Sequence, residues 1–338
     1  MARDRVLVTG ASGFIAKHIV IALLRDGFDV RGTVRGAARA DEVRRVVREA
    51  GEDANRCEFA KADLRSSDGW LAAATGCRYV LHTASPFPLA GQRGPVLIET
   101  ARGGTDFALR AAAQAGAERA IVTASVASVA YGHDGSRTSP FGEDDFTNLE
   151  SRDVSAYARS KTVAELLAWD VSRETGLALS TIHPGLVFGP VLDPRMGSSV
   201  KIVAMMLGGR VPLLPDITIP AVDVRDVALA HVRAMTAPDA GRRFMVVAPD
   251  TPSLPQIAAI LADAFPERRS KIPLRRLPSW VLRLVAKVSS GAAMLTADSG
   301  KARTFDTRPA HETLGLSFIP AREAAVATAE SLLRHGCV

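Results

Sequence analysis

A tyrosine and a lysine stand four residues apart in the segment YARSK, residues 157 to 161. The segment lies in a run of helical pattern over 156 to 175, and residues four apart on a helix share one face. The phenol of Tyr157 and the ammonium of Lys161 are therefore expected to point into the same space. A free phenol has a pKa of about 10, and a neighbouring cation stabilises its ionised form. The pair predicts that Tyr157 is a general acid that protonates a carbonyl oxygen.

A serine at the end of a strand is the third candidate for chemistry. Ser125 ends the apolar run 119 to 125. The carboxyl end of a strand in an open α/β sheet faces the crevice where ligands bind, so its hydroxyl is placed to hydrogen-bond a substrate carbonyl. A lone serine there is more often a helix cap or a solvated hydroxyl. Beside Tyr157 and Lys161 it is predicted to be catalytic.

The elements that must position these side chains follow an alternating pattern. Short apolar runs alternate with longer helical segments, and the runs are nearly continuous in apolar character, as in strands buried on both faces. The predicted fold class is α/β, a doubly wound parallel sheet of the Rossmann type. The predicted strands cover 5–10, 28–35, 57–63, 78–84, 119–125 and 177–183, and the predicted helices cover 14–26, 41–50, 68–75, 96–115 and 156–175.

The rhythm changes after His183, where a Gly- and Pro-rich loop over 183–199 precedes a short helix. A strand end with a helix (221–235) and a further strand (242–248) then return to the sheet. We predict two units. Residues 1–185 with about 221–248 form the dinucleotide-binding domain, and about 186–220 with 249–338 form a smaller, mostly helical substrate lobe.

A glycine-containing loop joins the first predicted strand to the first helix in VTGASGFIA, residues 8 to 16. Gly10 permits a tight turn, Gly13 lets the backbone approach a pyrophosphate, and Ala16 lets the helix pack closely on the sheet. The N-terminus of the helix favours the negative charge of the pyrophosphate. The alternative, an ordinary tight turn, lacks a reason for this strand–loop–helix setting, and the loop predicts a dinucleotide site.

The end of the second strand indicates which dinucleotide binds. Arg35 stands about 20 residues beyond the loop, where an acidic residue would select NAD and an arginine suits the 2′-phosphate of NADP. The nearest acids, Asp41 and Glu42, fall in the next helix. The alternative is a solvated arginine at a strand end. We predict NADP(H) in preference to NAD(H), because a guanidinium binds phosphate with two hydrogen bonds.

Composition excludes several other classes of protein. The chain has 338 residues, 47% of them hydrophobic, and no uncharged apolar run long enough to span a membrane. Its net charge of +6 comes from basic residues spread among 36 acidic ones, which argues against a nucleic-acid partner. The three cysteines, Cys57, Cys77 and Cys337, form no disulfide or metal-ligand pattern. We expect a cytoplasmic protein without a signal peptide, a membrane segment or a bound metal.

Motifs along nearly the whole chain carry a resemblance to a known family. TGASGFIAKHIV, TVR, ADL, VLHTASP, YARSKTVAE, HPGLVFGP, VDVRDVA and FDTRPAHETLGLSFIP stand in the family's order. The sequence resembles the extended short-chain dehydrogenase/reductases, and most closely their dihydroflavonol reductase, cinnamoyl-CoA reductase and carbonyl (aldehyde) reductase branch. The resemblance implies Ser125, Tyr157 and Lys161 as the catalytic set, with Lys161 also holding the nicotinamide ribose.

The motifs and the resemblance together define a wider predicted site. The chain departs from the family's usual residues at Val129 and Ala130, which argues against a flavonoid substrate, and at Phe107, which argues against a proton-relay role there. His183 stands where the family usually has an arginine. An apolar set is predicted to line the substrate pocket, although each member alone is more often a core residue: Phe87, Pro88, Phe141, Met205 and Met206. The predicted cofactor-binding residues are Thr9, Gly10, Ser12, Gly13, Phe14, Ile15, Arg35, Asp63, Leu64, Thr83, Ala84, Ser85, Tyr157, Lys161, Pro184, Gly185, Val187 and Ser199.

The predicted function is the transfer of a hydride from NADPH to an aldehyde or ketone, reversible as alcohol oxidation, on an apolar or aromatic substrate. A nicotinamide ring charge adds to Lys161 in lowering the pKa of Tyr157. Two alternatives stay open, an NAD-dependent nucleotide-sugar epimerase or dehydratase and a non-catalytic NADP-sensing protein. The expected partner is a small carbonyl or alcohol compound, and the chain is a candidate homodimer.

Overall fold

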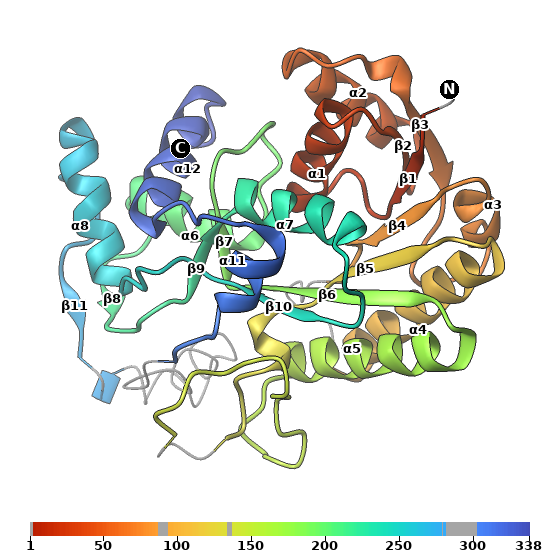
Figure 1. Ribbon diagram of the computed structural model, residues 1–338. Coiled ribbons are helices and arrows are strands. Elements are labelled where there is room, and N and C mark those ends of the chain that lie inside the picture. Colours follow the sequence, from red (N-terminus) through yellow and green to blue (C-terminus); the bar gives the residue numbers. More distant parts are fainter. Residues whose placement is uncertain (1–2, 87–93, 134–136, 279, 282–302) are drawn as a thin grey trace.

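The computed structural model describes residues 3–86, 94–133, 137–278, 280–281 and 303–338 (Figure 1). The strands are β1 (Arg5–Val8), β2 (Asp29–Val34), β3 (Cys57–Lys61), β4 (Tyr79–His82), β5 (Arg119–Thr123), β6 (Ala178–Pro184), β7 (Leu186–Phe188), β8 (Leu214–Pro215), β9 (Ala221–Asp223), β10 (Arg243–Val246) and β11 (Arg276–Leu277). The helices are α1 (Phe14–Arg25), α2 (Ala37–Glu49), α3 (Trp70–Ala74), α4 (Gly94–Gln114), α5 (Ala156–Thr175), α6 (Ser198–Leu207), α7 (Val224–Thr236), α8 (Leu254–Ala264), α11 (Arg308–Leu314) and α12 (Ala321–Arg334). Short 3₁₀ turns cover Ala54–Arg56, Val126–Ser128 and Pro266–Arg268.

The main sheet has seven parallel strands in the order β10-β6-β5-β4-β1-β2-β3. β1 lies inside the sheet between β2 and β4, with Val6 opposite Val30 of β2 on one side and opposite Tyr79 of β4 on the other. The chain therefore winds outward from β1 in both directions, and the point of reversal between β1 and β4 is where such sheets bind ligands. The predicted doubly wound fold is confirmed.

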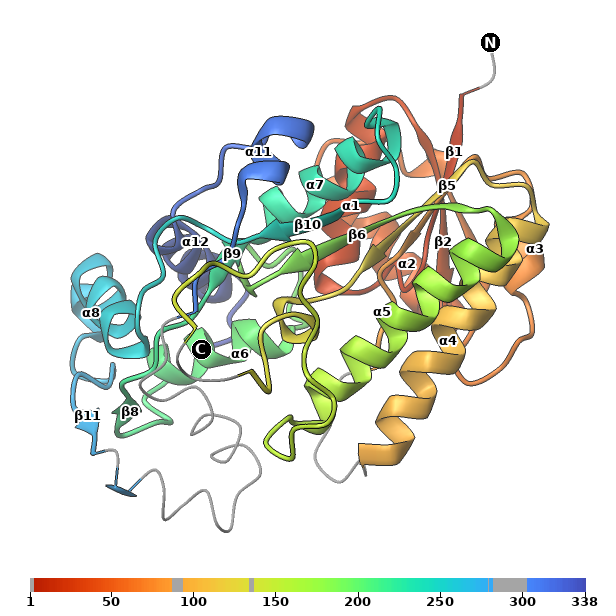
Figure 2. The ribbon, with the colours of Figure 1, turned by 60° about the horizontal axis from the view of Figure 1, so that its bottom comes forward.

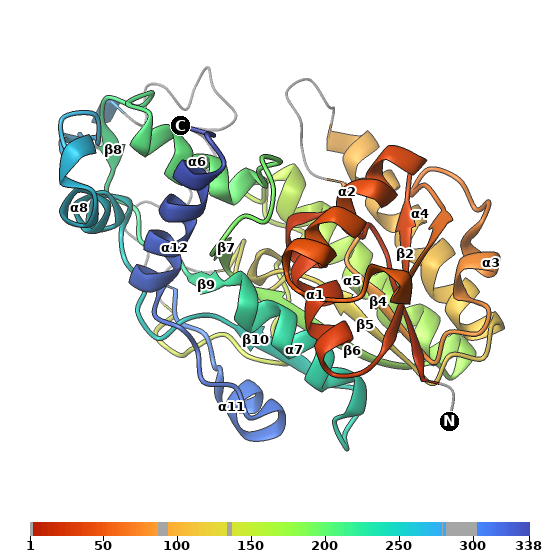
Figure 3. The ribbon, with the colours of Figure 1, turned by 90° about the horizontal axis from the view of Figure 1, so that it is seen from above.

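Helices cover both faces of this sheet, because its inner strands β1, β4 and β5 are buried along almost their whole length. α1, α2 and α7 pack on one face, where Ile19 and Leu23 of α1 enter the core (Figure 3). α3, α4 and α5 pack on the other, with α4 and α5 side by side and Trp70 and Leu109 buried against the strands (Figure 2). Both predicted layers are present.

A second hydrophobic core lies outside the sheet and is built from α6, α8 and α12. Its buried residues include Phe188, Val203, Ile257 and Leu332. Two short parallel pairs, β7 with β9 and β8 with β11, join this region to the chain leaving β6. Those four residues lie within the ranges 186–220 and 249–338, and the division of the chain into two units stays a prediction.

One segment packs differently from the predicted division of the chain. Ala310 and Leu314 of α11 and the following Leu316 are buried in the core between α7 and the sheet. Phe305 pairs with Phe141 next to the same layer. The stretch 305–318 was predicted in the substrate lobe, and its packing is with the sheet domain. The sequence could not predict this, because α11 has only seven residues and two buried side chains, too few to indicate which core the helix joins.

Two further observations concern the described residues as a whole. Among them, no helix combines the length and the apolar character needed to cross a bilayer. Nor do three or more of their His, Cys, Asp or Glu side chains gather as ligands for a metal ion.

Candidate active site

Ser125 and Tyr157 meet at the carboxyl end of β5. Ser125 caps the 3₁₀ turn Val126–Ser128, and its Oγ accepts the Ala127 N–H at 3.1 Å. The same hydroxyl is hydrogen-bonded to the phenol of Tyr157, which lies in the first turn of α5. Ser125 has only 8% of its surface exposed. The structure thus brings together two residues 32 positions apart that the sequence assigned to one site.

Lys161 lies one helical turn beyond Tyr157 on the same helix. Ser155 begins α5 by accepting the Ala158 N–H at 3.2 Å, which sets the register of both side chains. The buried Lys161 Nζ donates to the main-chain oxygen of Thr123, the last residue of β5, at 3.3 Å. Helix α5 is therefore tied to the end of β5, the strand that leads into Ser125.

Burial sets the ionisation of both groups. Burial raises the pKa of the Tyr157 phenol, and the hydrogen bond from Ser125 lowers it by a smaller amount. Burial lowers the pKa of Lys161 to about 8, and the charge of Glu165 opposes that shift. The prediction that Lys161 lowers the pKa of Tyr157 is wrong for the protein by itself. The ammonium is directed at the Thr123 carbonyl, and burial of the phenol favours its neutral form.

The loop after β1 has the shape required of a phosphate cradle. Gly10 has φ +63°, and a Cβ there would lie 3.1 Å from the Cβ of Ala84. Gly13 precedes α1, and no side chain caps this helix. The Oγ1 of Thr9 accepts the N–H groups of both Thr83 and Ala84 at 3.0 Å. The ends of β1 and β4 are therefore held together around a loop that has no room for a side chain at Gly10.

Arg35 lies exposed directly after β2. It acts electrostatically on Asp63, which follows β3, and the two residues thus share one edge of the site. A hydrogen bond from Arg65, with a smaller contribution from Arg35, lowers the pKa of Asp63 to about 2. Leu64 faces α4, because its side chain occupies the space where a Cβ of Gly104 would stand. Leu64 is thus a packing residue, and only Asp63 of this pair has a charge to offer.

The remaining predicted cofactor residues border the same crevice or its far side. Gly185 leaves room for the chain before β9, because a Cβ there would lie 2.2 Å from Pro220 O. The Ser199 hydroxyl donates to the carbonyl of Val187 at 2.6 Å, so its proton is engaged. Ser12, Phe14, Ile15, Thr83 and Ala84 are partly exposed around the loop, Ser85 is exposed, and Pro184 and Val187 are buried.

Comparison with known proteins agrees with this arrangement. Residues 6–248 match the NAD dependent epimerase/dehydratase family. The chain belongs to this family, the extended short-chain dehydrogenase/reductases. It is 36% identical to cinnamoyl-CoA reductase 1 of Arabidopsis thaliana, over 79% of this chain and 76% of the relative. It is 31% identical to cinnamoyl-CoA reductase 1 of Petunia hybrida, over 98% and 92%.

The fold of this extended short-chain dehydrogenase/reductase is also that of solved reductases. The structure of Gre2 in complex with NADPH from Candida albicans superposes with a TM-score of 0.81 at 25% identity, covering 98% of this chain and 99% of that one. The predicted family is confirmed.

Two of the predicted substrate residues of this family member lie in hydrophobic cores and not in a pocket. Met206 has no exposed surface and packs in the core of the smaller lobe, so it is not a pocket wall. Phe141 is buried against Val129 and Met245, where it belongs to a small core. Met205 is 40% exposed, and Phe87 and Pro88 lie outside the described residues. Apolar type alone did not distinguish a pocket wall from a core position.

A small cavity of about 20 Å³ adjoins the Ser125 turn, and sequence reasoning missed the residues around it. They come from segments far apart in the chain, so no local pattern marked them. The Arg303 guanidinium lies 4.3 Å from the ring centre of Tyr131, giving this cavity a cationic and aromatic wall. The lining residues are Val126, Ala130, Tyr131, Thr218, Pro220, Arg303 and Phe305.

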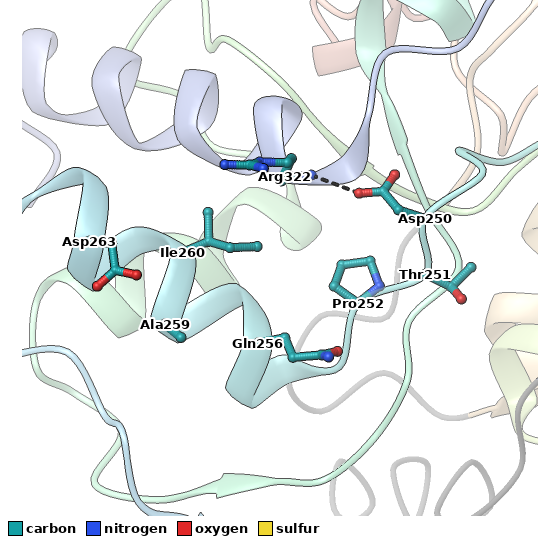
Figure 4. Close-up of a pocket in the computed structure, with 8 residues that line it drawn as sticks. All are labelled: Asp250, Thr251, Pro252, Gln256, Ala259, Ile260, Asp263 and Arg322. Atoms are coloured by element: carbon teal, nitrogen blue, oxygen red, sulfur yellow. Dashed lines mark hydrogen bonds between the residues drawn. The ribbon is translucent and has the colours of Figure 1, made fainter.

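A larger surface hollow of about 520 Å³ lies elsewhere, between α8 and the start of α12 (Figure 4). Its carboxylate Asp250 accepts the Ala321 and Arg322 N–H groups at 2.7 and 3.3 Å. Asp250 thus satisfies the first turn of α12, which is a structural task. None of the lining residues belongs to the site around Ser125.

Proposed function

We propose that the protein is an NADPH-dependent reductase that converts an aldehyde or ketone to an alcohol, and that it also runs in reverse. The observation that carries this proposal is the hydrogen bond between Ser125 and Tyr157 at the carboxyl end of β5, with Lys161 one turn along the same helix. The curated relatives named as reductases support it.

The three side chains have distinct tasks in this proposal. Ser125 orients the carbonyl oxygen and stabilises negative charge that develops on it. Tyr157 holds the proton that this oxygen receives, and burial keeps the phenol neutral until then. Lys161 is the cation of the site and binds the nicotinamide ribose. Bound NADPH supplies the hydride to the carbonyl carbon.

The residues present fit the dinucleotide. The Gly10 turn forms a cradle that a Cβ would fill, and the uncapped first turn of α1 offers N–H groups to a pyrophosphate. Arg35 is exposed, and no acidic residue stands next to it in the chain directly after β2. Its guanidinium therefore suits the 2′-phosphate. The Gre2 complex with NADPH supports the same choice.

The substrate we propose is a compound whose carbonyl carries an apolar or aromatic body. The apolar side chains of Val126, Ala130, Pro220 and Phe305 next to the Ser125 turn support this, although the cavity they line is itself only about the size of one water molecule. The cinnamoyl-CoA reductases among the relatives support an aromatic acyl group. Residues about 186–220 and 249–278 together with α12 would then form the substrate lobe over the NADP-binding domain.

The test is turnover by the purified protein with a panel of aldehydes and ketones, following NADPH and NADH oxidation separately. We expect activity with NADPH to exceed that with NADH. In Tyr157→Phe, kcat should fall by about 10²- to 10⁴-fold because the proton donor is removed. NADPH affinity should stay unchanged, since the ring is retained.

Tyr79→Phe is the matched control, because Tyr79 is also a buried tyrosine. It lies in β4, and its ring packs on that of Phe28, away from Ser125. This variant should keep wild-type kcat. Full activity in Tyr157→Phe would overturn the proposed mechanism. Tight NADPH binding without turnover would favour a cofactor sensor, and retained NAD with turnover of a nucleotide sugar would favour an epimerase.

A further inference from the structure

A buried charged cluster lies directly behind the catalytic residues, and the proposed mechanism does not use it. It joins Glu165 of α5, His183 of β6 and Arg243 of β10, whose side chains are between 0% and 6% exposed. Glu165 Oε1 accepts Arg243 Nε at 2.7 Å and lies 3.1 Å from His183 Nε2. Burial favours the neutral acid, but His183 and Arg243 hold the pKa of Glu165 well below its usual value.

The other side of the imidazole faces the Ser125 turn. His183 Nδ1 lies 3.2 Å from the main-chain oxygen of Ser125 and 3.3 Å from Ser128 Oγ. The Ser128 hydroxyl itself donates to Ser125 O at 2.7 Å, and the Ser128 amide does so at 2.9 Å. A carbonyl oxygen only accepts hydrogen bonds, so the contact with Ser125 requires a proton on Nδ1. A carboxylate also only accepts, so the simultaneous contact with Glu165 requires a second proton on Nε2, and the two contacts together need the doubly protonated ring.

The cluster therefore connects helix α5, which carries Tyr157, with the turn after β5 that carries Ser125. Tyr157, Lys161 and Glu165 follow one another at four-residue intervals along α5 and so share a face. Tyr157 holds the Ser125 turn at its hydroxyl, and Glu165 reaches the same turn at its carbonyl through His183. Stability alone is a weak reason for such a cluster, because desolvation offsets most of the attraction in a buried ion pair.

We propose that His183, oriented by Glu165, is a positioning residue for Ser125. Its Nδ1–H donates to the Ser125 carbonyl and fixes the turn that presents the catalytic hydroxyl to Tyr157 and to the substrate. The kinetic part of this inference rests on the proposed reductase function.

Two matched substitutions separate the two contacts of the imidazole. In His183→Asn the amide nitrogen stands near the place of Nδ1 and keeps a donor toward Ser125 O. In His183→Gln the amide nitrogen stands near the place of Nε2. This variant keeps the contact with Glu165 and loses the contact with Ser125 O. We expect His183→Gln to lose about 10- to 100-fold in kcat, and His183→Asn to keep at least about tenfold more activity than His183→Gln.

A purely structural role predicts a different result. The two variants would then lose kcat in proportion to their loss of thermal stability, in either order. KM for NADPH should be unchanged in both variants, since neither contact involves the Gly10 loop. Equal kcat values, or a higher kcat in His183→Gln, would overturn the proposal.

Hydrogen exchange gives a readout that needs no activity. The Ser128 amide donates to the Ser125 carbonyl, so its exchange reports whether the turn is held. It should exchange faster in His183→Gln than in His183→Asn. The same rate in both variants would overturn the inference even if the reductase proposal stands. Slow exchange in His183→Asn alone would support the inference even if no carbonyl compound is reduced.

Discussion

At the scale of single residues, the site contrasts a neutral phenol with a cation that titrates readily. Tyr157 and Lys161 are both buried, and burial disfavours the charged form of each. The phenol is therefore protonated over the whole neutral range. The ammonium, with a pKa of about 8, loses its charge just above neutrality. We therefore expect the ionisation of Lys161, and not that of Tyr157, to limit activity on the alkaline side.

We expect kcat/KM for NADPH to fall as the pH rises through about 8, because the free enzyme then loses the Lys161 cation. The nearby His82 and His231, whose pKa values burial lowers to about 3 and about 4, do not titrate in this range. The measurement is a pH–rate profile at saturating carbonyl compound.

The charge of Glu165 raises the pKa of Lys161, which provides an internal control. In Glu165→Gln the alkaline limb should move to lower pH. A wild-type profile that stays flat between pH 7 and 9 would contradict this assignment.

At the scale of elements, three of the residues in the proposed site lie where an element begins or ends. Ser125 caps the turn after β5, Tyr157 lies in the first turn of α5, and Gly10 is in the turn between β1 and α1. Element ends leave backbone groups unpaired and available to ligands. The cost is that the turn must adopt one conformation, and at Gly10 this conformation is left-handed.

Gly10→Ala should lower the free energy of unfolding by more than about 1 to 2 kcal/mol, which is the usual cost of a side chain in the left-handed region. The added Cβ also meets Ala84 at 3.1 Å. NADPH affinity should fall as well, since the cradle is filled. Urea unfolding and a binding titration measure the two effects.

Gly27→Ala is the matched control. Gly27 has φ +89°, and a Cβ there would have no atom within 4 Å. It should show the loss of stability due to backbone strain and no change in NADPH affinity. Equal NADPH affinities in Gly10→Ala and the wild type would argue against the cradle.

At the scale of the whole molecule, α7 links the sheet domain to the segment that leads into α12. Asp226 of α7 is 5% exposed, and its Oδ2 accepts the Ile319 N–H at 2.8 Å. Burial raises the pKa of this carboxyl to about 6, although the Ile319 N–H acts in the opposite direction. The junction thus contains an acid whose ionised form is costly at neutral pH.

Stability should therefore decrease as the pH rises from about 4 to above 6. In this window the folded protein retains a proton on Asp226 that the unfolded chain, with a carboxyl pKa of about 3.9, releases. Asp226→Asn removes the titration and can still accept the Ile319 N–H. It should raise the free energy of unfolding at pH 7 by up to about 3 kcal/mol, and the gain should vanish near pH 4.

Asp263→Asn serves as the reference, because the Asp263 side chain is 76% exposed. Its effect should stay within about 0.5 kcal/mol at either pH. Unfolding curves that show the same pH dependence for the wild type and Asp226→Asn would exclude Asp226 as the cause.

Much of this architecture followed from patterns in the chain. Apolar runs such as 119–125 must be buried on both faces, so their alternation with helical segments predicted the parallel sheet. Gly10 and Gly13 between a strand and a helix marked the loop, because few residues other than glycine accept that geometry. The spacing of Tyr157 and Lys161 predicted one helical face, which α5 provides.

The tertiary structure decided what depends on contacts between distant segments. Met206 and Phe141 have the composition of pocket walls, but the packing of α6 and of Phe305 places them in cores. Arg303 and Thr218 adjoin the Ser125 turn only because the later chain folds back over it. The same holds for the link from Glu165 through His183 to Ser125. Local sequence fixes periodicity and backbone conformation, whereas a residue's surroundings, and with them its pKa and its role, arise only when the separate segments pack.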